Sequence, residues 1–540
     1  MHRILVAVVL VVAAVLRFWG LQFGLPNDLA RPDEEKIIHA ALVVVGGDPN
    51  PHFFLYPSLF IYLAAAAYTL VFALGATSVS AASYAAHAVA DPSLLHLVPR
   101  TLSAAAGVAT VAVVYAAARE LFSTRVSLAA SAFLAVAYLH VRDAHFGTTD
   151  VPVALACMCA FWAAARCAGR GATVSRAAVM GLLCGLAAST KYNAVLVAAP
   201  AGLAILADAL ESRRWPTQRE LALLLLCGAC AGLAFVLTTP FAVLDRAGFI
   251  AQFSEQRRIF AGIQNGSIIG PARSVLGGAR GWSYYPTFTL PHGLGWPLFL
   301  ASLAGAAWLF VERWRRALLV LAFPAVYYAS MGMGQLLYAR NMVPILPFLC
   351  LAAGAFVGGA ATRIERRFRN RPAAAFCGAT LVAALAAPTA AEAIRFDRIA
   401  SLTDTRVQAA RWLDTHVPAG MSVYQTGIFY GHVQPVPADR YRTASFDERR
   451  DRFVVGGDPT RLPDAVVRLD SPLVVYSRVP DALLPLLESR YVLTRVFAAR
   501  ARGAALEGIY DQQDAWYLPF ANLAAVVRPG PDVYIYLRRD

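Results

Sequence analysis

The chain has 540 residues, of which 58% are hydrophobic and only 15% are charged. Soluble proteins carry roughly a quarter charged residues, so this composition excludes a soluble globular enzyme, a disordered chain, a coiled coil and a secreted disulfide scaffold. The formal net charge is +14, and only two of the 48 basic Lys and Arg residues are lysines, Lys36 and Lys191. In a polytopic membrane protein an excess of arginine is first a signal of topology, and no basic amphipathic face indicates a nucleic-acid partner.

The membrane part is predicted from apolar stretches, because a helix needs roughly 20 apolar residues to cross the hydrocarbon layer. The first stretch has no small-residue cleavage site, which favours an uncleaved span over a signal peptide. The candidate spans in chain order are residues 4–25, 56–75, 101–118, 126–141, 150–166, 176–190, 192–208, 220–239, 290–310, 317–333, 342–360 and 373–391.

Arginine-rich loops orient these spans. The arginine cluster at residues 363–371 is expected in the cytoplasm, and counting back from it places four features outside: Asp150, Lys191, the loop 240–289 and Arg340. Counting forward from an inside N-terminus places the loop 26–55 outside as well. The two counts differ by one crossing, which the weakly apolar segment Ala81–Pro99 can supply. We therefore expect about thirteen spans.

The composition changes after the last span, because the remaining residues are charged and punctuated by Pro and Gly. A capped amphipathic helix is predicted after Asp404, strands at Leu473–Tyr476 and Val533–Leu537, and a second helix at Asp481–Glu488. This segment is long enough to form its own core. We therefore expect two domains, a polytopic helical membrane domain and a small extracytoplasmic α/β domain, over residues 1–392 and 393–540.

Carboxylates cluster in the loop after the first span, where the sequence reads Arg31-Pro-Asp33-Glu34-Glu35-Lys36. Adjacent carboxylates at the edge of a membrane suit general base catalysis or cation binding. A short interfacial helix starting at Pro32 is predicted, with Asp33 and Glu34 in its first turn. The alternative is a solvated acidic loop whose carboxylates merely favour a helix N-terminus.

Further charged residues stand at the outer ends of predicted spans. Asp150 lies at the mouth of a span, where an ionised carboxylate is costly unless it is paired or faces a cavity. Lys191 interrupts an apolar stretch, and a buried ammonium requires an anion, for which a phosphate is a natural candidate. Arg340 and Arg100 are additional cations at span ends. The alternatives are a snorkelling lysine and arginines that anchor lipid headgroups.

A divalent metal ion is a further alternative, because Asp33, Glu34, Asp150 and His145 could gather around one. Their spacing has no dedicated metal-binding signature, so no metal ligands are assigned. The eight cysteines all lie in apolar runs, which favours packing roles over metal or redox chemistry.

Several short motifs follow one another in a specific order along residues 1–390. They are Arg31-Pro-Asp33-Glu34, Asn50-Pro-His52 followed by Tyr56-Pro57-Ser58, Arg100-Thr-Leu-Ser, His145-Phe-Gly-Thr-Thr-Asp150, Thr190-Lys191-Tyr192, Thr239-Pro240-Phe and Arg340-Asn-Met-Val-Pro. Together they resemble the GT-C glycosyltransferases of family 39, the protein mannosyltransferases, and the related bacterial aminoarabinose transferases. The resemblance implies a GT-C fold and transfer of a sugar from a polyprenyl-phosphate donor to a protein, lipid or polysaccharide acceptor on the outer side.

The resemblance also implies roles for the charged residues. Asp33 would accept the proton of the acceptor alcohol with help from Glu34, and Asp150 would orient the acceptor, the sugar or Lys191. The phosphate leaves as a stable anion, so no general acid is needed and a single displacement inverts the anomeric centre. Cations instead stabilise the developing negative charge. The residues expected to bind substrate are Lys191, Arg340, Arg100, His52, Tyr56, His145 and Tyr192.

The chain departs from the family at its second span, which in the family often opens with His-Pro-Pro or Lys-Pro-Pro. Here the sequence is Leu55-Tyr56-Pro57-Ser58. His52 is the nearest candidate for the missing basic group.

Two other classes of function stay open, a lipid-linked sugar flippase or transporter and a non-catalytic protein that binds a cell-envelope polymer. Transporters usually carry repeated halves and helices broken near the membrane centre. Here the ionisable residues gather at the outer ends of spans, which favours an enzyme. The Ala- and Arg-rich composition indicates a GC-rich bacterium, and hence a multi-pass protein of the bacterial cytoplasmic membrane.

Overall fold

The structure is a computed structural model that describes residues 2–75, 91–261, 263–264, 267–268, 281–369, 371–434 and 439–539. Its residues cluster into two compact units. The first unit comprises Met1–Trp19, Ile37–Leu70 and Val98–Ile394, and the second comprises Gly20–Lys36, Val71–Leu97 and Arg395–Asp540. The segment that carries the clustered carboxylates, residues 26–36 and hereafter the acidic loop, therefore belongs to the same unit as the C-terminal residues.

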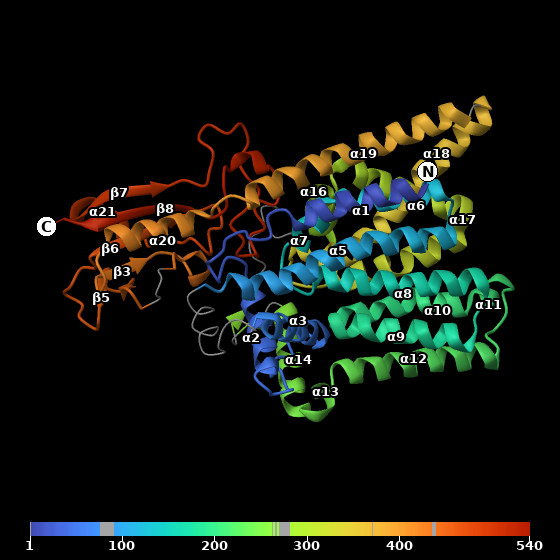
Figure 1. Cartoon of the computed structure of the whole chain (residues 1–540), viewed down its shortest axis with the longest axis horizontal. Helices are drawn as coiled ribbons and strands as arrows, with labels where there is room; N and C mark the ends of the chain where they lie inside the picture. The colour runs from blue at the N-terminus through green and yellow to red at the C-terminus, as the bar shows by residue number, and fades with distance from the viewer. Residues whose placement is uncertain are drawn as a thin grey trace. The chain divides into compact units, whose positions relative to one another are not determined.

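Helices make up nearly all of the chain before the C-terminal sheet (Figure 1). They are α1 (His2–Phe18), α2 (Glu34–Val45), α3 (Leu59–Gly75), α5 (Ser93–Leu121), α6 (Thr124–Val136), α7 (Tyr138–Ala144), α8 (Asp150–Arg170), α9 (Val174–Thr190), η1 (Tyr192–Val197), α10 (Ala198–Ile205), α11 (Ala207–Glu211), α12 (Gln218–Thr238), α13 (Phe241–Leu244), α14 (Arg246–Phe260), α15 (Gly281–Tyr284), η2 (Tyr285–Thr289), α16 (Leu290–Leu294), α17 (Trp296–Gly332), η3 (Ala339–Ile345), α18 (Leu346–Phe368) and α19 (Arg371–Ala400). A short hairpin of β1 (Ile263–Gln264) and β2 (Ser267–Ile268) follows α14.

Several of these helices are built to cross a membrane. Among the described residues, five helices are long and apolar enough to do so: α5, α8, α12, the run Ala339–Phe368, and the run Pro372–His416, which contains all of α19 except its first residue. Two bent pairs, α6 with α7 and Gly281–Leu294 with α17, raise the number to seven. Shorter apolar helices cover Leu59–Gly75, Val174–Thr190 and Tyr192–Ile205. The chain is therefore a multi-pass membrane protein.

The helices differ from the predicted spans at several places, including the following three. The helix α1 ends at Phe18, and Gly20 and Gly24 follow with positive φ. The observed helix therefore ends seven residues before the predicted span 4–25 does. The predicted span 290–310 starts in α16 and crosses a bend of 115° into α17. The predicted span 317–333 lies in the same helix α17, where Arg313 has a non-helical backbone and separates two helical segments. The segment Ala81–Pro99 lies outside the described residues up to residue 90, and its last residues open the helix α5.

Within the first unit, the helices pack in pairs around a core of small and aliphatic side chains. The helix α9 packs between α8 and α12 (Figure 1). The helix α18 contacts both α6 and α17. Glycines allow these close contacts: a Cβ atom at Gly181 or Gly185 would lie 2.2 Å from a backbone oxygen of α12. The close packing fixes the ends of α8 and α9, where the candidate site lies.

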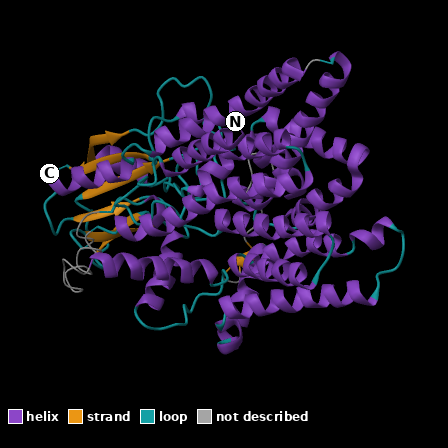
Figure 2. Cartoon of the chain, turned by 45° about the vertical axis from the view of Figure 1, so that its right-hand side comes forward, coloured by secondary structure: helices purple, strands orange, loops and turns teal. Residues whose placement is uncertain are grey.

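The second unit contains a six-stranded mixed sheet, drawn in orange in Figure 2. The strand order is β5-β4-β3-β6-β8-β7, in which β3 runs parallel to β4 and β6 while the other pairs are antiparallel. Alternation along β6 sends Val467 toward α20 and Val466 toward α21, so one helix covers each face. The elements are β3 (Ser422–Gln425), β4 (Arg442–Asp447), β5 (Arg452–Val455), β6 (Ala465–Asp470), β7 (Tyr491–Phe497), β8 (Asp532–Arg538), α20 (Thr405–His416) and α21 (Leu483–Arg490).

The α/β character of the C-terminal segment is confirmed, with one wrong element. Asp404 caps α20 by accepting a hydrogen bond from the Arg406 N–H group at 2.8 Å, as predicted. The predicted strand at Leu473–Tyr476 is instead a turn closed by a hydrogen bond from the Tyr476 N–H group to the Leu473 carbonyl oxygen at 3.0 Å. An apolar run of only four residues does not distinguish a strand from an apolar turn.

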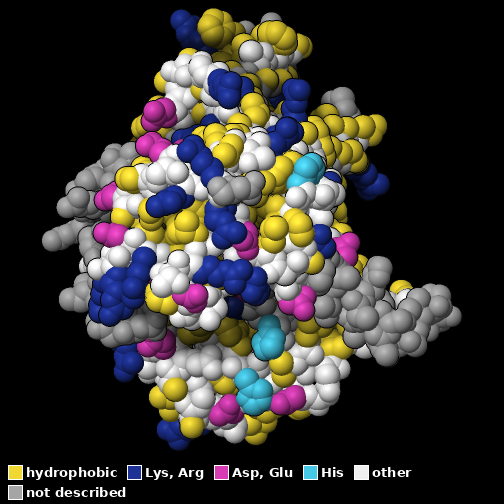
Figure 3. All heavy atoms as spheres, turned by 90° about the vertical axis from the view of Figure 1, so that its left-hand side faces the viewer, with side chains coloured by type: hydrophobic (Ala, Val, Ile, Leu, Met, Phe, Trp, Pro, Cys, Tyr) yellow, Lys and Arg dark blue, Asp and Glu magenta, His cyan; other side chains and the backbone are white. Residues whose placement is uncertain are grey.

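Basic side chains are spread over the face of the molecule drawn in Figure 3, with hydrophobic side chains between them. The second unit has exposed arginines on several of its strands. These include Arg442 on β4, Arg452 on β5 and Arg495 on β7.

Candidate active site

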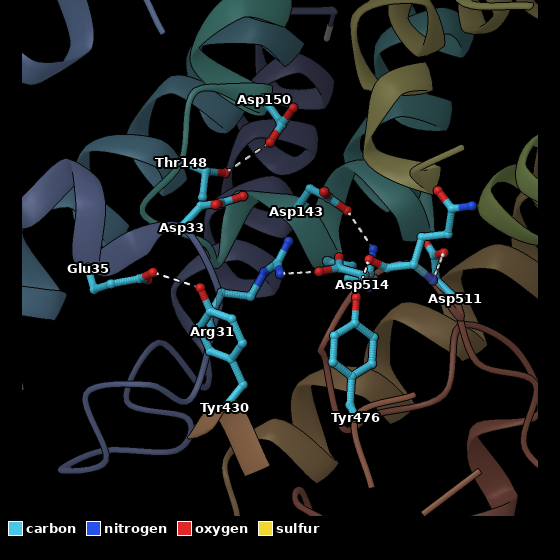
Figure 4. A network of polar contacts seen from close by, with 12 residues as sticks. Arg31, Asp33, Glu35, Asp143, Thr148, Asp150, Tyr430, Tyr476, Asp511 and Asp514 are labelled. Atoms are coloured by element: carbon cyan, nitrogen blue, oxygen red, sulfur yellow. Dashed lines mark hydrogen bonds and ion pairs between the residues drawn. The ribbon is translucent and has the colours of Figure 1, made fainter. Parts of the chain in front are cut away.

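Asp150 and Lys191 form an ion pair inside the first unit. Asp150 is the first residue of α8 and Lys191 caps the C-terminal end of α9, so each charge is favoured by the dipole of its own helix. The Lys191 Nζ atom donates to Asp150 Oδ1 at 2.7 Å, and the two side chains are 10% and 4% exposed. Thr148 Oγ1 donates to the other carboxylate oxygen at 3.1 Å (Figure 4). The Asp150 carboxylate, which was expected to need a partner, therefore has two hydrogen-bond donors, Lys191 and Thr148.

An apolar groove of about 440 Å³ is lined by residues that neighbour this pair in the sequence. It lies between α3, α5, α8 and α9, and its wall includes Pro152 and Thr190, close neighbours in sequence of Asp150 and Lys191. The rest of the wall is almost entirely aliphatic, with Leu63, Leu102, Ala109, Leu155 and Leu186 among its residues. The groove can therefore hold a hydrocarbon chain next to a buried cation.

Tyr192, directly after Lys191, joins three segments of the first unit. Its hydroxyl donates to the Phe54 carbonyl oxygen at 2.9 Å, and its ring lies 5.1 Å from the ring of Phe253 on α14. Gln252 on α14 accepts from the Phe54 N–H group at 2.7 Å and donates to the His52 carbonyl oxygen at 3.0 Å. These contacts fix the segment 52–54 and α14 beside the Lys191 region.

His52 and Tyr56, the candidate substrate contacts of the second span, both lie in the first unit. The His52 ring is 60% exposed, and its Nε2 atom lies 2.8 Å from Asp48 Oδ2. This hydrogen bond, together with one from the Asn50 N–H group, lowers the pKa of Asp48. Tyr56 is half-buried, and its ring centroid lies 5.8 Å from that of Phe53.

Arg100, His145 and Arg340 are buried in the same unit. Arg100 is fully buried on α5, where the loop after α7 packs against its backbone at Gly147. The two ring nitrogens of His145 each lie 2.9 Å from a backbone carbonyl oxygen, of Val141 and of Trp19. His145 therefore ties α7 to the end of α1. Arg340 is 8% exposed on η3, and its guanidinium lies 4.6 Å from the centroid of the Tyr338 ring.

Two hydrogen-bonded amide–phenol pairs that the sequence reasoning missed lie next to these residues in the chain. The Asn193 side chain donates to the Tyr327 hydroxyl at 3.1 Å, and the Asn341 side chain donates to the Tyr285 hydroxyl at 3.1 Å. Asn193 follows Lys191 by two positions and Asn341 follows Arg340 directly. The sequence signal that could have identified these asparagines was their position next to a predicted buried cation. This signal is weak.

The acidic loop carries the other candidate carboxylates, in the second unit. Asp33 is 9% exposed and precedes α2 with φ of +72°, a left-handed conformation that is uncommon for any residue other than glycine. Lys36 Nζ donates to its Oδ1 atom at 2.8 Å. Glu34 is fully buried, with its Oε2 atom 3.3 Å from His96 Nδ1. The predicted helix therefore starts at Glu34, two residues after Pro32, and Asp33 lies just outside its first turn.

Residues from the C-terminal part of the second unit contact the acidic loop on both sides of Asp33 (Figure 4). Arg31 Nη1 lies 2.6 Å from Asp514 Oδ1, and the Tyr430 hydroxyl donates to Glu35 Oε1 at 2.8 Å. Burial raises the pKa of Glu35; the hydrogen bond from Tyr430 opposes the shift and the charge of Asp33 adds to it. Neither Asp514 nor Tyr430 was predicted, because nothing in their local sequence marks them as partners of residues about 400 to 480 positions away.

Within the described ranges, no group of three or more His, Cys, Asp or Glu side chains is arranged to hold a metal ion. The candidate carboxylates are instead partnered by cations, hydroxyls or a histidine. The site residues therefore include two charge-paired groups, one in each unit.

The comparison with known families supports the motif resemblance. Residues 95–238 match the family model described as dolichyl-phosphate-mannose-protein mannosyltransferase. That segment contains five of the candidate residues, namely Arg100, His145, Asp150, Lys191 and Tyr192. No curated protein sequence matches the chain significantly.

Solved structures share the fold. The apo form of an Archaeoglobus fulgidus oligosaccharyltransferase aligns with a TM-score of 0.56 at 14% identity, over 100% of this chain and 88% of that one. ArnT from Cupriavidus metallidurans bound to undecaprenyl phosphate aligns with a TM-score of 0.52 at 17% identity, over 91% and 96% of the two chains. The fold is that of the GT-C glycosyltransferases.

A third GT-C structure is the archaeal oligosaccharyltransferase AglB from Archaeoglobus fulgidus in complex with an inhibitory peptide and a dolichol-phosphate. It aligns with a TM-score of 0.53 at 13% identity, over 81% of this chain and 64% of that chain. The present chain therefore spans less than two thirds of the length of that relative. The GT-C fold expected from the order of the motifs is confirmed.

Proposed function

We propose that this chain is an integral-membrane glycosyltransferase that moves a sugar from a polyprenyl-phosphate carrier to an acceptor on the extracytoplasmic side. The observation that carries the proposal is the buried Lys191–Asp150 pair beside an apolar groove. In the same fold, ArnT holds undecaprenyl phosphate and AglB holds a dolichol-phosphate. A lipid tail in the groove would bring its phosphate to the lysine.

The ammonium of Lys191 has capacity for a phosphate. An ammonium has three N–H donors, and among the described residues Lys191 uses one of them, on Asp150. Arg340 and Arg100 are assigned as further cations for the leaving phosphate. Such fixed charges stabilise a developing anion without reorganising during the reaction.

The chemistry we assign is a single displacement. The acceptor hydroxyl gives its proton to Asp33 while its oxygen bonds to the anomeric carbon, and the bond from that carbon to the phosphate oxygen breaks. The polyprenyl phosphate leaves with the electron pair, and the anomeric centre is inverted. Lys36 orients the Asp33 carboxylate by donating to it, Asp150 holds Lys191 in place, and Glu34 supports the start of α2 through His96.

The remaining residues are assigned to binding and positioning. His52, Tyr56 and Tyr192 would contact the sugar or the acceptor, and His145 would hold the loop before Asp150. We place the protein in the bacterial cytoplasmic membrane with about thirteen spans. In this arrangement residues 1–392 form the catalytic membrane domain and residues 393–540 form an extracytoplasmic domain.

The groove gives a test of the donor class. Ala156 on α8 lines the groove, whereas Ala222 on α12 is exposed and does not. We expect Ala156→Phe to raise KM for a long-chain polyprenyl-phosphate sugar by about tenfold, since filling the groove removes buried apolar area from the tail. A short-chain analogue should be unaffected, and Ala222→Phe should behave as wild type. A wild-type KM for the long-chain donor in Ala156→Phe would contradict the proposed tail site.

A further inference from the structure

The acidic loop is attached to the C-terminal residues at four positions between Asn27 and Glu35. At its start, the Asn27 side chain donates to the His432 carbonyl oxygen at 3.4 Å and the Asp28 N–H group donates to Gln434 Oε1 at 3.0 Å. Further along lie the Arg31–Asp514 and Glu35–Tyr430 contacts. The partners come from two short segments, 430–434 and the turn at Asp514. All of these residues belong to the second unit.

The Arg31–Asp514 ion pair is fully inside that unit, with side chains that are 0% and 3% exposed. Asp514 is fixed by its own turn, because its N–H group donates to the Asp511 carbonyl oxygen at 3.1 Å and its carbonyl oxygen accepts from the Trp516 N–H group at 2.7 Å. The Arg31 guanidinium lies 6.0 Å from the centroid of the Trp516 ring. A buried charge that loses its partner is strongly disfavoured, so this pair holds Arg31 in one place.

Tyr430 holds the other end of the loop. It lies in the short helical turn Phe429–Gly431, and its carbonyl oxygen accepts from Arg406 Nη1 at 2.6 Å. Arg406 in turn pairs with Asp404 at 2.8 Å, and both side chains are 1% exposed. The Tyr430 hydroxyl that reaches Glu35 therefore stands on a backbone that is fixed to the start of α20.

Asp33 lies between these two attachments in a strained backbone conformation. An L-residue at φ of +72° persists only where its surroundings hold it. Arg31 is held two positions before it and Glu35 two positions after it (Figure 4). The geometry points to a role for the C-terminal domain: Asp514 and Tyr430 are positioning residues that hold Asp33 in its reactive conformation. The inference rests on the proposed function in one respect, the role of Asp33 as the base. The attachment of the acidic loop does not depend on it.

The first test needs no substrate and uses the full chain in nanodiscs. Hydrogen–deuterium exchange is measured on peptides covering residues 26–36 in wild type, Asp514→Asn and Tyr430→Phe. We expect exchange there to rise about tenfold in both variants, with no change in α3. The matched controls are Asp464→Asn, which loses an ion pair to Arg538, and Tyr491→Phe, which loses a hydrogen bond to the Pro463 carbonyl oxygen. Unchanged exchange in the acidic loop of both test variants would overturn the inference.

The second test measures turnover with a polyprenyl-phosphate sugar. Displacing a catalytic group by about 1 Å can cost about 100-fold in rate, so we expect kcat to fall by that order in Tyr430→Phe while the donor KM stays within about twofold. Asp514→Glu should recover part of the rate lost in Asp514→Asn. Wild-type kcat in Tyr430→Phe, with transfer by the wild-type chain present, would overturn the positioning role. Absence of transfer in the wild-type chain would instead refute the proposed function and leave the exchange result to decide the inference.

Discussion

Removing one partner of the Lys191–Asp150 pair should destabilise the first unit strongly. The two charges are 2.7 Å apart and at least 90% buried by side-chain exposure. Breaking such a pair leaves an uncompensated buried charge and costs about 3–5 kcal/mol, whereas an exposed pair contributes about 1 kcal/mol or less. We therefore expect Asp150→Asn and Lys191→Met each to lower the free energy of unfolding by about 3 kcal/mol. The double variant should lose less than the sum of the two.

The same two variants should differ in their effect on donor binding. Lys191→Met removes a charged hydrogen bond to the phosphate, about 1.5–3 kcal/mol, which corresponds to an affinity about 10- to 100-fold weaker. Asp150→Asn keeps a side-chain oxygen that can hold the ammonium in place but removes the negative charge that repels the phosphate, so the affinity should become tighter. If the pair served only to stabilise the fold, the two variants would not change the donor affinity in opposite directions.

The assay is the binding of undecaprenyl phosphate to the full chain in nanodiscs, measured at a temperature where each variant is folded. Arg363→Met is the control, because it removes an exposed cation from an ion pair with Glu312 at 2.9 Å. Its affinity and stability should match wild type. Wild-type affinity in Lys191→Met, or equal weakening by Asp150→Asn, would refute the assignment of Lys191 to the phosphate.

Two further predictions concern the acidic loop. Asp33→Asn should lower kcat by at least about 100-fold, because general base catalysis contributes a factor of that order. The Kd for undecaprenyl phosphate and the melting temperature should stay at wild-type values. Retained turnover would reject Asp33 as the base. The raised pKa of Glu35 means that the folded chain binds this proton more tightly than the unfolded chain. The stability that this proton provides is complete below the ordinary value of 4.5 and is lost as the pH rises through the raised folded value. Glu35→Gln should therefore flatten the dependence of thermal stability on pH above pH 4.5. An unchanged slope would contradict the burial of this carboxyl.

Much of the membrane part could be predicted because its signals are local. Apolar stretches placed most of the helices, and the high cost of an unpaired charge among apolar residues singled out Asp150 and Lys191 before any contact was known. The structure pairs these two residues across 41 positions of sequence. Helix ends were less predictable: α1 stops at Phe18 because the chain turns at Gly20, although apolar residues continue.

The attachment of the acidic loop to the C-terminal residues could not be predicted. Composition separates residues 393–540 from the rest of the chain, but it carries no information about which distant segment packs against them. Arg31 and Asp514 are 483 positions apart, and each alone reads as an ordinary charged residue in a loop. The same reasoning assigned Glu34 as the helper of Asp33, whereas the structure turns Glu34 toward His96 and gives Glu35 the contact with Tyr430.

The central claim is that Asp33 and Lys191 serve one transfer reaction that begins with a polyprenyl-phosphate sugar. The most direct measurement is single-turnover transfer from a radiolabelled undecaprenyl-phosphate sugar, with membranes that lack this protein as the source of acceptor. Wild type, Asp33→Asn and Lys191→Met are compared in full-length form. We expect transfer by wild type, bound but untransferred donor in Asp33→Asn, and weakly bound donor in Lys191→Met. Transfer at the wild-type rate by either variant would contradict the account.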